Sequence, residues 1–303
     1  MAKILVSGLI NIETSVRVDK FPIEYSPVRY PFFGVNSTIS GVGFNVAKAL
    51  AKLGDQAILM SMIGADMYTE QIYKALTDAK IEHQHVLDNL VQTPQSVILF
   101  DHEGRRQINV DLKDVQSQSY PLDQFESALP GCELAAMCNI NYSREFLQAV
   151  KSANIPLATD IHSISRLDDE YEQDFLAAAD ILFCSDEMLP CSPEEWAQKV
   201  FNRYGVNILV VGLGRQGAFL AVRDVKLSSR YPAIHTRPVV NTIGAGDALF
   251  SCFTHYYLRT KDPSLALQKA IVFASYKIGE SGAANGFLGE DDLELLYRQS
   301  SVQ

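Results

Sequence analysis

Apolar stretches of strand length alternate with amphipathic stretches of helix length along most of this chain. From residue 57 onward, short apolar runs precede runs whose apolar residues recur every three or four positions, the spacing of a helix with one buried face. Residues 3–10 form a further apolar run, which we expect to be the first buried strand. The later strands are expected at residues 57–63, 134–140, 156–159, 181–184 and 207–211, and the helices at residues 67–79, 146–151, 170–179, 193–201 and 265–278. Because strands that alternate with helices pair in parallel, this order predicts an α/β fold with a mostly parallel central sheet.

Four shorter segments show a different pattern, in which apolar and polar residues alternate as they do in half-exposed strands. They are residues 15–19, 28–33, 96–100 and 107–112. Strands of this type do not fit the interior of a doubly wound sheet, whose strands are covered on both faces. We therefore predict a small antiparallel sheet, built from residues of about 13–38 and 94–113, that stands off the main domain as a lid.

A loop of small residues opens an amphipathic helix near position 244. Without bulky side chains at Gly244, Ala245 and Gly246, the backbone N–H groups can converge on one anion, and the helix N-terminus adds positive potential there. Asp247 in the first helical turn would hold a carboxylate beside this anion, where it could accept a proton from an attacking hydroxyl. This combination favours phosphoryl transfer. The tetrapeptide alone is equally compatible with an ordinary helix start that binds nothing.

A second glycine-containing loop opens the helix expected at residues 41–54. Gly41 and Gly43 would let a ligand approach the backbone closely, and Asn45 could both donate to and accept from a hydroxyl. Asn11 and Glu13 follow the first strand, at the edge of an open parallel sheet where ligands bind. A turn or capping role for these two residues is an equal alternative.

Gly212, Gly214 and Gly217 have the spacing of a dinucleotide-binding loop. Residues 218–222, however, are expected to be a strand, whereas a dinucleotide-binding loop is followed by a helix. A β-hairpin or a turn at the edge of a nucleotide is therefore favoured over a dehydrogenase. The small-residue loop at 281–286 could line a flat slot for a base or simply end the preceding helix.

Composition and charge narrow the classes of function. The chain has 303 residues, of which 47% are hydrophobic, and no linker or repeat divides it, so we expect a single domain over residues 1–303. Its 26 basic and 36 acidic residues give a net charge of −10, which disfavours binding to nucleic acid or to an anionic membrane. No segment approaches the length of a membrane span. The odd number of cysteines, without metal-ligand spacing, indicates free thiols in the cytoplasm; they are Cys132, Cys138, Cys184, Cys191 and Cys252.

Together, these features resemble the PfkB-type, ribokinase-like carbohydrate kinases over nearly the whole chain. The most specific similarity is at residues 241–247, Asn-Thr-Ile-Gly-Ala-Gly-Asp, which resemble the second signature of that family; residues 41–54 resemble the first. Supporting similarities lie at residues 64–66, at 104–106 and at Asp160. The resemblance implies a ribokinase-like three-layer α/β/α fold with a β-sheet lid, and transfer of the γ-phosphoryl group of ATP, with Mg²⁺, to a hydroxyl of a small carbohydrate.

The resemblance also implies a role for each loop. Asp247 would be the general base, and the N–H groups of Gly244, Ala245 and Gly246 would stabilise the transferring phosphoryl group. The acceptor would be held by Asn11, Glu13, Gly41, Gly43 and Asn45. The ATP site would be lined by Gly212, Gly214, Gly217, Thr242, Ala283 and Asn285.

The chain departs from the family pattern at several positions. Asn241 replaces an aspartate that the family often directs at a monovalent cation, so cation activation is in doubt. The Asn-x-x-Glu pattern associated with metal binding is not reproduced at Ser185, which leaves the metal ligands unknown, with Glu187 as a weak candidate. These substitutions motivate an alternative hypothesis, a non-catalytic sugar or nucleotide sensor.

The acceptor is only partly defined by the sequence. Val42 lies where a kinase for sugar phosphates would place a cation, which favours an unphosphorylated sugar, although Arg105 and Arg106 could still bind a phosphate. A nucleoside kinase is the nearest rival, because an aromatic group could form a wall for a base; the group comprises Tyr30, Phe32 and Phe33. The same residues could instead pack within the lid or between subunits. The resemblance implies a homodimer formed through the lid.

Overall fold

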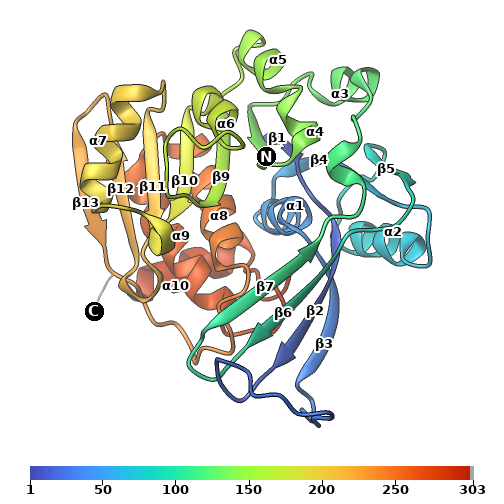
Figure 1. The fold of residues 1–303 in the computed structure, drawn as a ribbon. Coiled ribbons are helices and arrows are strands. Elements are labelled where there is room, and N and C mark those ends of the chain that lie inside the picture. The colour runs from blue at the N-terminus through green and yellow to red at the C-terminus, as the bar shows by residue number, and fades with distance from the viewer. Residues whose placement is uncertain (301–303) are drawn as a thin grey trace.

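A computed structural model describes residues 1–300, and its main body is built around a long central sheet (Figure 1). The strand order is β13-β12-β11-β10-β9-β8-β1-β4-β5. The strands β1 to β11 of this sheet run parallel, and β12 and β13 extend it antiparallel at one edge. Their bounds are β1 Lys3–Ser7, β4 Gln56–Gly64, β5 Val86–Leu90, β8 Leu134–Met137, β9 Leu157–Ser163, β10 Ile181–Ser185, β11 Ile208–Gly212, β12 Ala218–Val222 and β13 Leu227–Tyr231. The expected mostly parallel sheet is confirmed.

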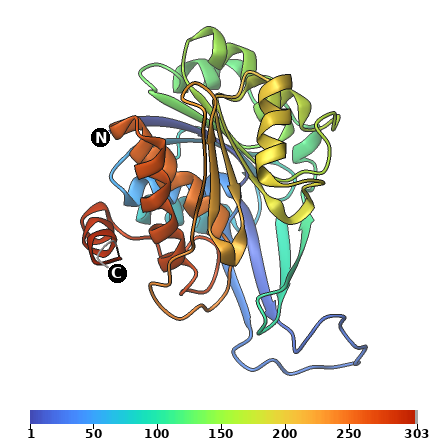
Figure 2. The same cartoon turned by 90° about the vertical axis from the view of Figure 1, so that its left-hand side faces the viewer.

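Helices cover both faces of this sheet, which gives the expected three layers (Figure 2). Alternate residues of β1 show the division, since Ile4 and Val6 belong to one hydrophobic core and Leu5 belongs to the other. The first core contains side chains of α1 Val42–Lys52, α2 Thr69–Asp78, α8 Ala245–Thr260, α9 Pro263–Lys277 and α10 Glu290–Ser300. The second contains side chains of α3 Leu122–Ala128, α4 Asn141–Arg144, α5 Leu147–Ser152, α6 Gln173–Ala178 and α7 Pro193–Arg203.

A separate four-stranded sheet extends from one end of the main body, as expected for the lid (Figure 1). Its strands are β2 Asn11–Arg17, β3 Val35–Ser40, β6 Gln95–Phe100 and β7 Arg106–Asp111, in the order β3-β2-β6-β7. The expectation of a purely antiparallel sheet is wrong, because β2 and β6 pair in parallel. Both strands leave the same edge of the main sheet, after the parallel strands β1 and β5, and so they enter the lid in the same direction.

The segment at residues 28–33 is not a strand, contrary to its alternating pattern. It lies in the long connection between β2 and β3, which projects beyond the lid (Figure 2). Tyr30 and Phe32 are 75% and 77% exposed and Phe33 is fully exposed, so their side chains have no buried face that would hold an extended strand in register. In this structure they do not form a packed wall for a base.

The glycines at the start of α1 allow a close approach between parts of the chain itself. Gly41 has φ +103°, and a Cβ atom built on it would lie 2.4 Å from the carbonyl oxygen of Leu9. A Cβ atom on Gly43 would lie 2.4 Å from the carbonyl oxygen of Gly8. These contacts dock the start of α1 against the connection from β1 to β2 and so place Asn45, in the first turns of α1, beside the base of the lid.

Candidate active site

The start of α8 has the geometry of an anion-binding site. Gly244 caps the helix in the left-handed conformation, with φ +74°, and no side chain bonds to the N–H groups of the first turn. The N–H of Ala245 makes a long bond of 3.3 Å to the carbonyl oxygen of Thr242, which an anion would have to replace. The N–H groups of Gly246 and Asp247 have no partner within the helix and remain available to an anion. Gly244 is also tightly packed, because a Cβ atom on it would lie 2.6 Å from the carbonyl oxygen of Ala283. Both the left-handed conformation and this contact require glycine.

Asp247 lies in the first turn of α8 and is only 8% exposed. Asn45 Nδ2 donates a hydrogen bond of 2.7 Å to Asp247 Oδ2, although the two residues are 202 positions apart in the chain. Burial raises the pKa of Asp247, while the charges of His162 and Lys277 and the bond from Asn45 act in the opposite direction. The carboxylate is thus oriented by one amide beside the N-terminus of a helix, which suits a general base next to a bound phosphate.

A buried carboxylate, Glu13, lies on the lid side of the same site. Glu13 Oε1 accepts a bond of 3.3 Å from the N–H of Ala283, and Ser40 Oγ lies 2.9 Å from Glu13 Oε2. Ser40 Oγ is also 3.2 Å from Asn45 Oδ1, and its single proton can go to only one of these two oxygens. Burial raises the pKa of Glu13, whereas the donors Ser40 and Ala283 lower it. Ser40 and Asn45 therefore lie between Glu13 of the lid and the candidate base, with Ser40 bonded to one of its two neighbours at a time.

Asn11 completes this side of the site with an unused hydrogen-bond acceptor. Its Nδ2 donates to Ser96 Oγ at 3.1 Å, which ties β2 to β6. Its Oδ1 is buried and has no partner among the described residues. Buried polar atoms are normally paired, so this oxygen has the property expected of an atom that binds a hydroxyl of a ligand.

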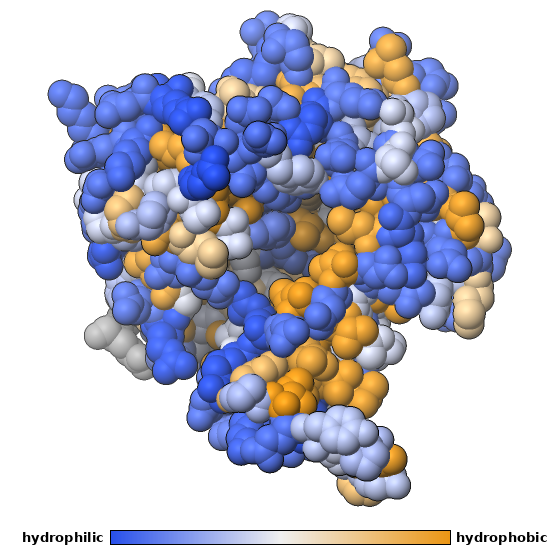
Figure 3. All heavy atoms as spheres, viewed as in Figure 1, coloured by the Kyte–Doolittle hydropathy of each residue, from blue (hydrophilic) through white to orange (hydrophobic). Residues whose placement is uncertain are grey.

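The lid also contacts the other side of the site through Arg106 on β7. Its Nη1 donates to Thr242 Oγ1 at 3.0 Å, and its Nη2 lies 3.4 Å from Glu187 Oε1. Thr242 and Glu187 belong to the main body, just before α8 and after β10. Arg106 therefore bridges the lid and the main body, and Figure 3 shows a hollow between these two parts.

The residues predicted to line the ATP site fall into two loops. Gly212 ends β11, and Gly214 has φ +53° with open space where a Cβ atom would be. Gly217 has φ +101° and is crowded by the carbonyl oxygen of Tyr231, so the β11–β12 hairpin itself requires glycine there. This hairpin agrees with the strand expected after the loop. Asn285 bonds the carbonyl oxygen of Ser281 within the second loop, and Ala283 is buried. Their contacts with a nucleotide remain a prediction.

Three polar residues lie beside the site although the loop motifs of the sequence did not predict them there. Asp160 is 9% exposed, and its carboxylate lies close to the loop of residues 244–246 at the start of α8, here called the anion loop. A Cβ atom built on Gly246 would lie 3.7 Å from Asp160 Oδ2. The N–H of His162 donates to Asp160 Oδ1 at 2.9 Å. Lys277, at the end of α9, is fully buried and acts on the charges of Asp247 and Glu13. The family similarity had indicated Asp160 but not Lys277.

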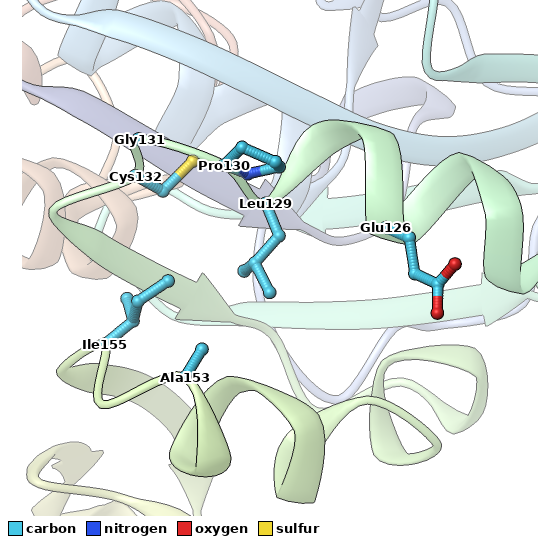
Figure 4. Close-up of a pocket in the computed structure, with 7 residues that line it drawn as sticks. All are labelled: Glu126, Leu129, Pro130, Gly131, Cys132, Ala153 and Ile155. Carbon is cyan, nitrogen blue, oxygen red and sulfur yellow. The ribbon is translucent and has the colours of Figure 1, made fainter.

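A hollow of about 410 Å³ lies at the opposite edge of the main sheet (Figure 4). It is formed where α3 ends and where β8 and β9 begin, whereas the site described above lies at the carboxyl ends of the strands. Open α/β sheets bind ligands at their carboxyl ends, so this hollow has no part in the arrangement around Asp247.

Comparison with known proteins assigns the chain to a family. The model of the pfkB family carbohydrate kinases matches residues 1–288, which include every residue of the site. The chain belongs to this family. As a pfkB family kinase, it is a phosphotransferase that uses a hydroxyl group as acceptor.

Individual relatives are distant in sequence but similar over the whole chain. Deoxyribokinase from Salmonella typhi is 24% identical over 301 residues, covering 94% of this chain and 95% of that protein. The structure of Mak1, a microbiome-derived acarbose kinase, superposes with a TM-score of 0.87 at 24% identity and covers 98% of this chain and 99% of that one. Ribokinase from Arabidopsis thaliana, solved with ribose and ATP, gives 0.79 at 21% identity, with coverage of 98% and 99%. The two structures establish a ribokinase-like fold.

Two further observations concern membrane spans and metal ligands among the described residues. Within residues 1–300, no helix has the length and apolar character needed to cross a membrane. In the same range, no group of three or more acidic, histidine or cysteine side chains gathers as a metal site. The second finding is compatible with a kinase, because Mg²⁺ in such sites is held by one or two carboxylates together with the phosphates of the substrate.

Proposed function

We propose that this pfkB family kinase transfers the γ-phosphoryl group of ATP to a hydroxyl of a small, unphosphorylated sugar. The observation that carries the proposal is the bond between Asn45 and Asp247 at the N-terminus of α8, where an anion site and a general base meet. The acceptor hydroxyl would lie beside Asp247, and the phosphoryl group would lie over the N–H groups of Gly244, Ala245 and Gly246. Asp247 would take the proton as the new O–P bond forms, and the helix start would stabilise the developing charge.

The acceptor side favours a neutral polyol over a sugar phosphate. Glu13, Asn11 and Asn45 offer a carboxylate and amides, which pair with hydroxyl groups. A carboxylate repels a phosphate group on the acceptor, and Arg106 is directed at Thr242 and Glu187 instead. Gly41 and Gly43 would line the same space through their backbone.

ATP would occupy the side of the site opposite the lid, between the loop at residues 212–217 and the loop at residues 281–286. Gly212, Gly214 and Gly217 would lie along one edge of the nucleotide, and Thr242, Ala283 and Asn285 along the other. Mg²⁺ would neutralise the β- and γ-phosphates, and Asp160, a carboxylate beside Gly246, is the group that fits its preference for oxygen ligands.

The test of this function is acceptor-dependent release of ADP from Mg-ATP. A panel of free sugars, sugar acids, sugar phosphates and nucleosides would be compared at equal concentration. We expect turnover with one or a few free sugars. Turnover only with nucleosides would support the nucleoside kinase, and ligand binding without any turnover would support the sensor.

Replacing Glu13 with Gln should raise the KM for the acceptor about tenfold to a hundredfold, because a hydrogen bond to a charged group is replaced by a weaker one. The KM for Mg-ATP should change much less, because the amide oxygen of Gln can still accept from the N–H of Ala283 in the ATP-side loop. Steady-state kinetics with each substrate varied in turn would measure both values. An equal rise in both KM values would contradict the assignment of Glu13 to the acceptor.

Replacing Arg106 with Ala should lower kcat/KM about tenfold by removing the charge-assisted bonds that hold the lid to the main body. Hydrolysis of ATP without acceptor should rise relative to transfer, because a loosened lid admits water. Arg105→Ala is a matched control, since Arg105 bonds Asp101 and Glu103 within the lid hairpin. Equal effects of the two substitutions would refute a specific bridging role for Arg106.

A homodimer through the lid is also proposed, on the basis of an apolar surface. Apolar side chains gather over the small sheet (Figure 3), where Ile108 and Val110 lie on one face of β7 and are each 50% exposed. Exposed apolar side chains that gather in this way are typical of an interaction surface. A cytoplasmic location is proposed from the free thiols of the five cysteines, four of which are buried.

A further inference from the structure

Lys277 places a fully buried ammonium group at the floor of the site. The residue is 0% exposed, and its Nζ donates to the carbonyl oxygen of Ile243 and, at 2.9 Å, to that of Gly282. Burying a charge without partners is strongly destabilising. The two carbonyl oxygens are therefore the groups that make burial of this ammonium possible.

These carbonyl oxygens belong to two different loops of the active site. Ile243 immediately precedes Gly244 of the anion loop, and Gly282 immediately precedes Ala283, whose N–H binds Glu13. The loops touch where Gly244 packs against Ala283. Lys277 thus joins the loop that would bind the phosphoryl group to the loop that orients the acceptor carboxylate.

The charged groups around Lys277 come from several elements. Asp247 of α8 and Glu13 of β2 favour its charged form, as does Glu280, whereas Arg237 opposes it; burial lowers its pKa to about 8. In return, the ammonium lowers the pKa of both Asp247 and Glu13. A single internal cation therefore serves the base and the acceptor carboxylate together.

The surroundings of Lys277 do not fit a bound monovalent cation. Rings of backbone carbonyl oxygens are the usual ligands of K⁺, and here the carbonyl oxygens of Ile243 and Gly282 already accept from an ammonium group. The neighbouring position 241 carries a neutral Asn, whose Oδ1 accepts from the N–H of Ile243 at 3.1 Å. Position 241 thus supplies no carboxylate to balance an added cation.

We propose that Lys277 is a positioning residue whose ammonium group replaces a monovalent cation, by holding the Ile243 and Gly282 carbonyl oxygens together so that the anion loop is preformed without K⁺. The inference rests on the proposed use of ATP at this site. It assigns to a side chain of α9, outside the signature segments, the role of fixing the geometry around Asp247.

The wild-type protein provides the first test. Calorimetric titration with Mg-ADP in choline chloride and in potassium chloride, at equal ionic strength, should give dissociation constants that agree within about twofold, less than the effect of one hydrogen bond. Binding that is tenfold or more tighter in potassium would overturn the proposal. Mg-ADP binding needs no acceptor, so a protein that binds no Mg-ADP in either salt would refute the use of ATP instead.

The second test removes the ammonium group. Lys277→Ala should weaken Mg-ADP binding in choline about ten- to a hundredfold, because two buried carbonyl oxygens lose their donor, and potassium or ammonium ions should restore part of the loss. Lys269→Ala is the matched control, since Lys269 is a buried lysine of the same helix that pairs with Glu294 away from the site. It should lower the thermal midpoint but change neither Mg-ADP affinity nor its salt dependence. The proposal would be overturned if Lys277→Ala bound Mg-ADP in choline as tightly as the wild-type protein does. It would also be overturned if the variant folded but no monovalent cation restored its lost affinity. If the variant does not fold, the titration of the wild-type protein decides.

Discussion

Replacing Asp247 with Asn should lower kcat by about 10²- to 10⁴-fold, the contribution typical of a positioned general base. The amide cannot accept the proton of the acceptor hydroxyl, while its similar shape preserves the packing of this buried position. Mg-ADP should bind as tightly as before or more tightly, because a negative charge beside the phosphate site is lost. ADP release with the preferred acceptor measures the first effect, and calorimetry measures the second.

Asp123→Asn provides a matched control, because Asp123 is also an aspartate in the first turn of a helix, α3, away from the site. It should leave kcat unchanged. The wild-type pH profile gives an independent check: kcat/KM should fall as the pH drops through the pKa of Asp247, because protonation removes the base. Since burial raises this pKa, the fall should begin above the pH at which an exposed aspartate would be protonated. A profile that stays flat down to the ordinary aspartate range would contradict the role of Asp247.

Replacing Gly244 with Ala should lower kcat by about 10²- to 10³-fold, comparable to the loss of a donor from an oxyanion hole. The new Cβ atom would lie 2.6 Å from the carbonyl oxygen of Ala283 and would force the loop to move. The N–H groups of the first turn of α8 would then no longer converge on the phosphoryl group. Steady-state kinetics with saturating Mg-ATP would measure the change.

Gly54→Ala separates this effect from backbone strain. Gly54 also has a positive φ, +91°, but a Cβ atom there would meet no atom within 4 Å. Both variants should lose stability on thermal unfolding, since alanine is strained at positive φ. Only Gly244→Ala should lose activity, and equal kinetics for the two variants would show that the anion loop does not depend on this contact.

Much of the fold follows from local patterns in the sequence. The alternation of apolar and amphipathic runs predicted the parallel sheet because each buried strand needs a covering helix. The alternating segments at 96–100 and 107–112 likewise form strands, which pair with each other as the hairpin of β6 and β7. The segment at 28–33 shows the limit of such patterns, because alternation produces a strand only where a neighbouring strand supplies hydrogen bonds, as β6 does for the exposed strand β7.

The site was predictable where a loop carries its own geometry. The small residues at 244–246 demand a tight turn, and Asp247 follows directly in the helix. The contact of Asn45 with Asp247 was not predictable, because it joins residues 202 positions apart through the packing of α1 against α8. Lys277 was hidden for another reason, since a lysine in the last turn of a helix usually lies in solvent and favours the helix dipole. Only the tertiary structure shows that this lysine is buried between two loops.

The most direct test of the central claim is the fate of the γ-phosphoryl group. The wild-type protein would be incubated with Mg-ATP and the preferred free sugar from the panel, and the products would be followed by ³¹P NMR. The account predicts one new phosphomonoester signal that grows at the rate at which ADP appears, and no such signal with Asp247→Asn. Release of ADP with inorganic phosphate as the only other product, or an undiminished phosphomonoester signal with Asp247→Asn, would contradict it.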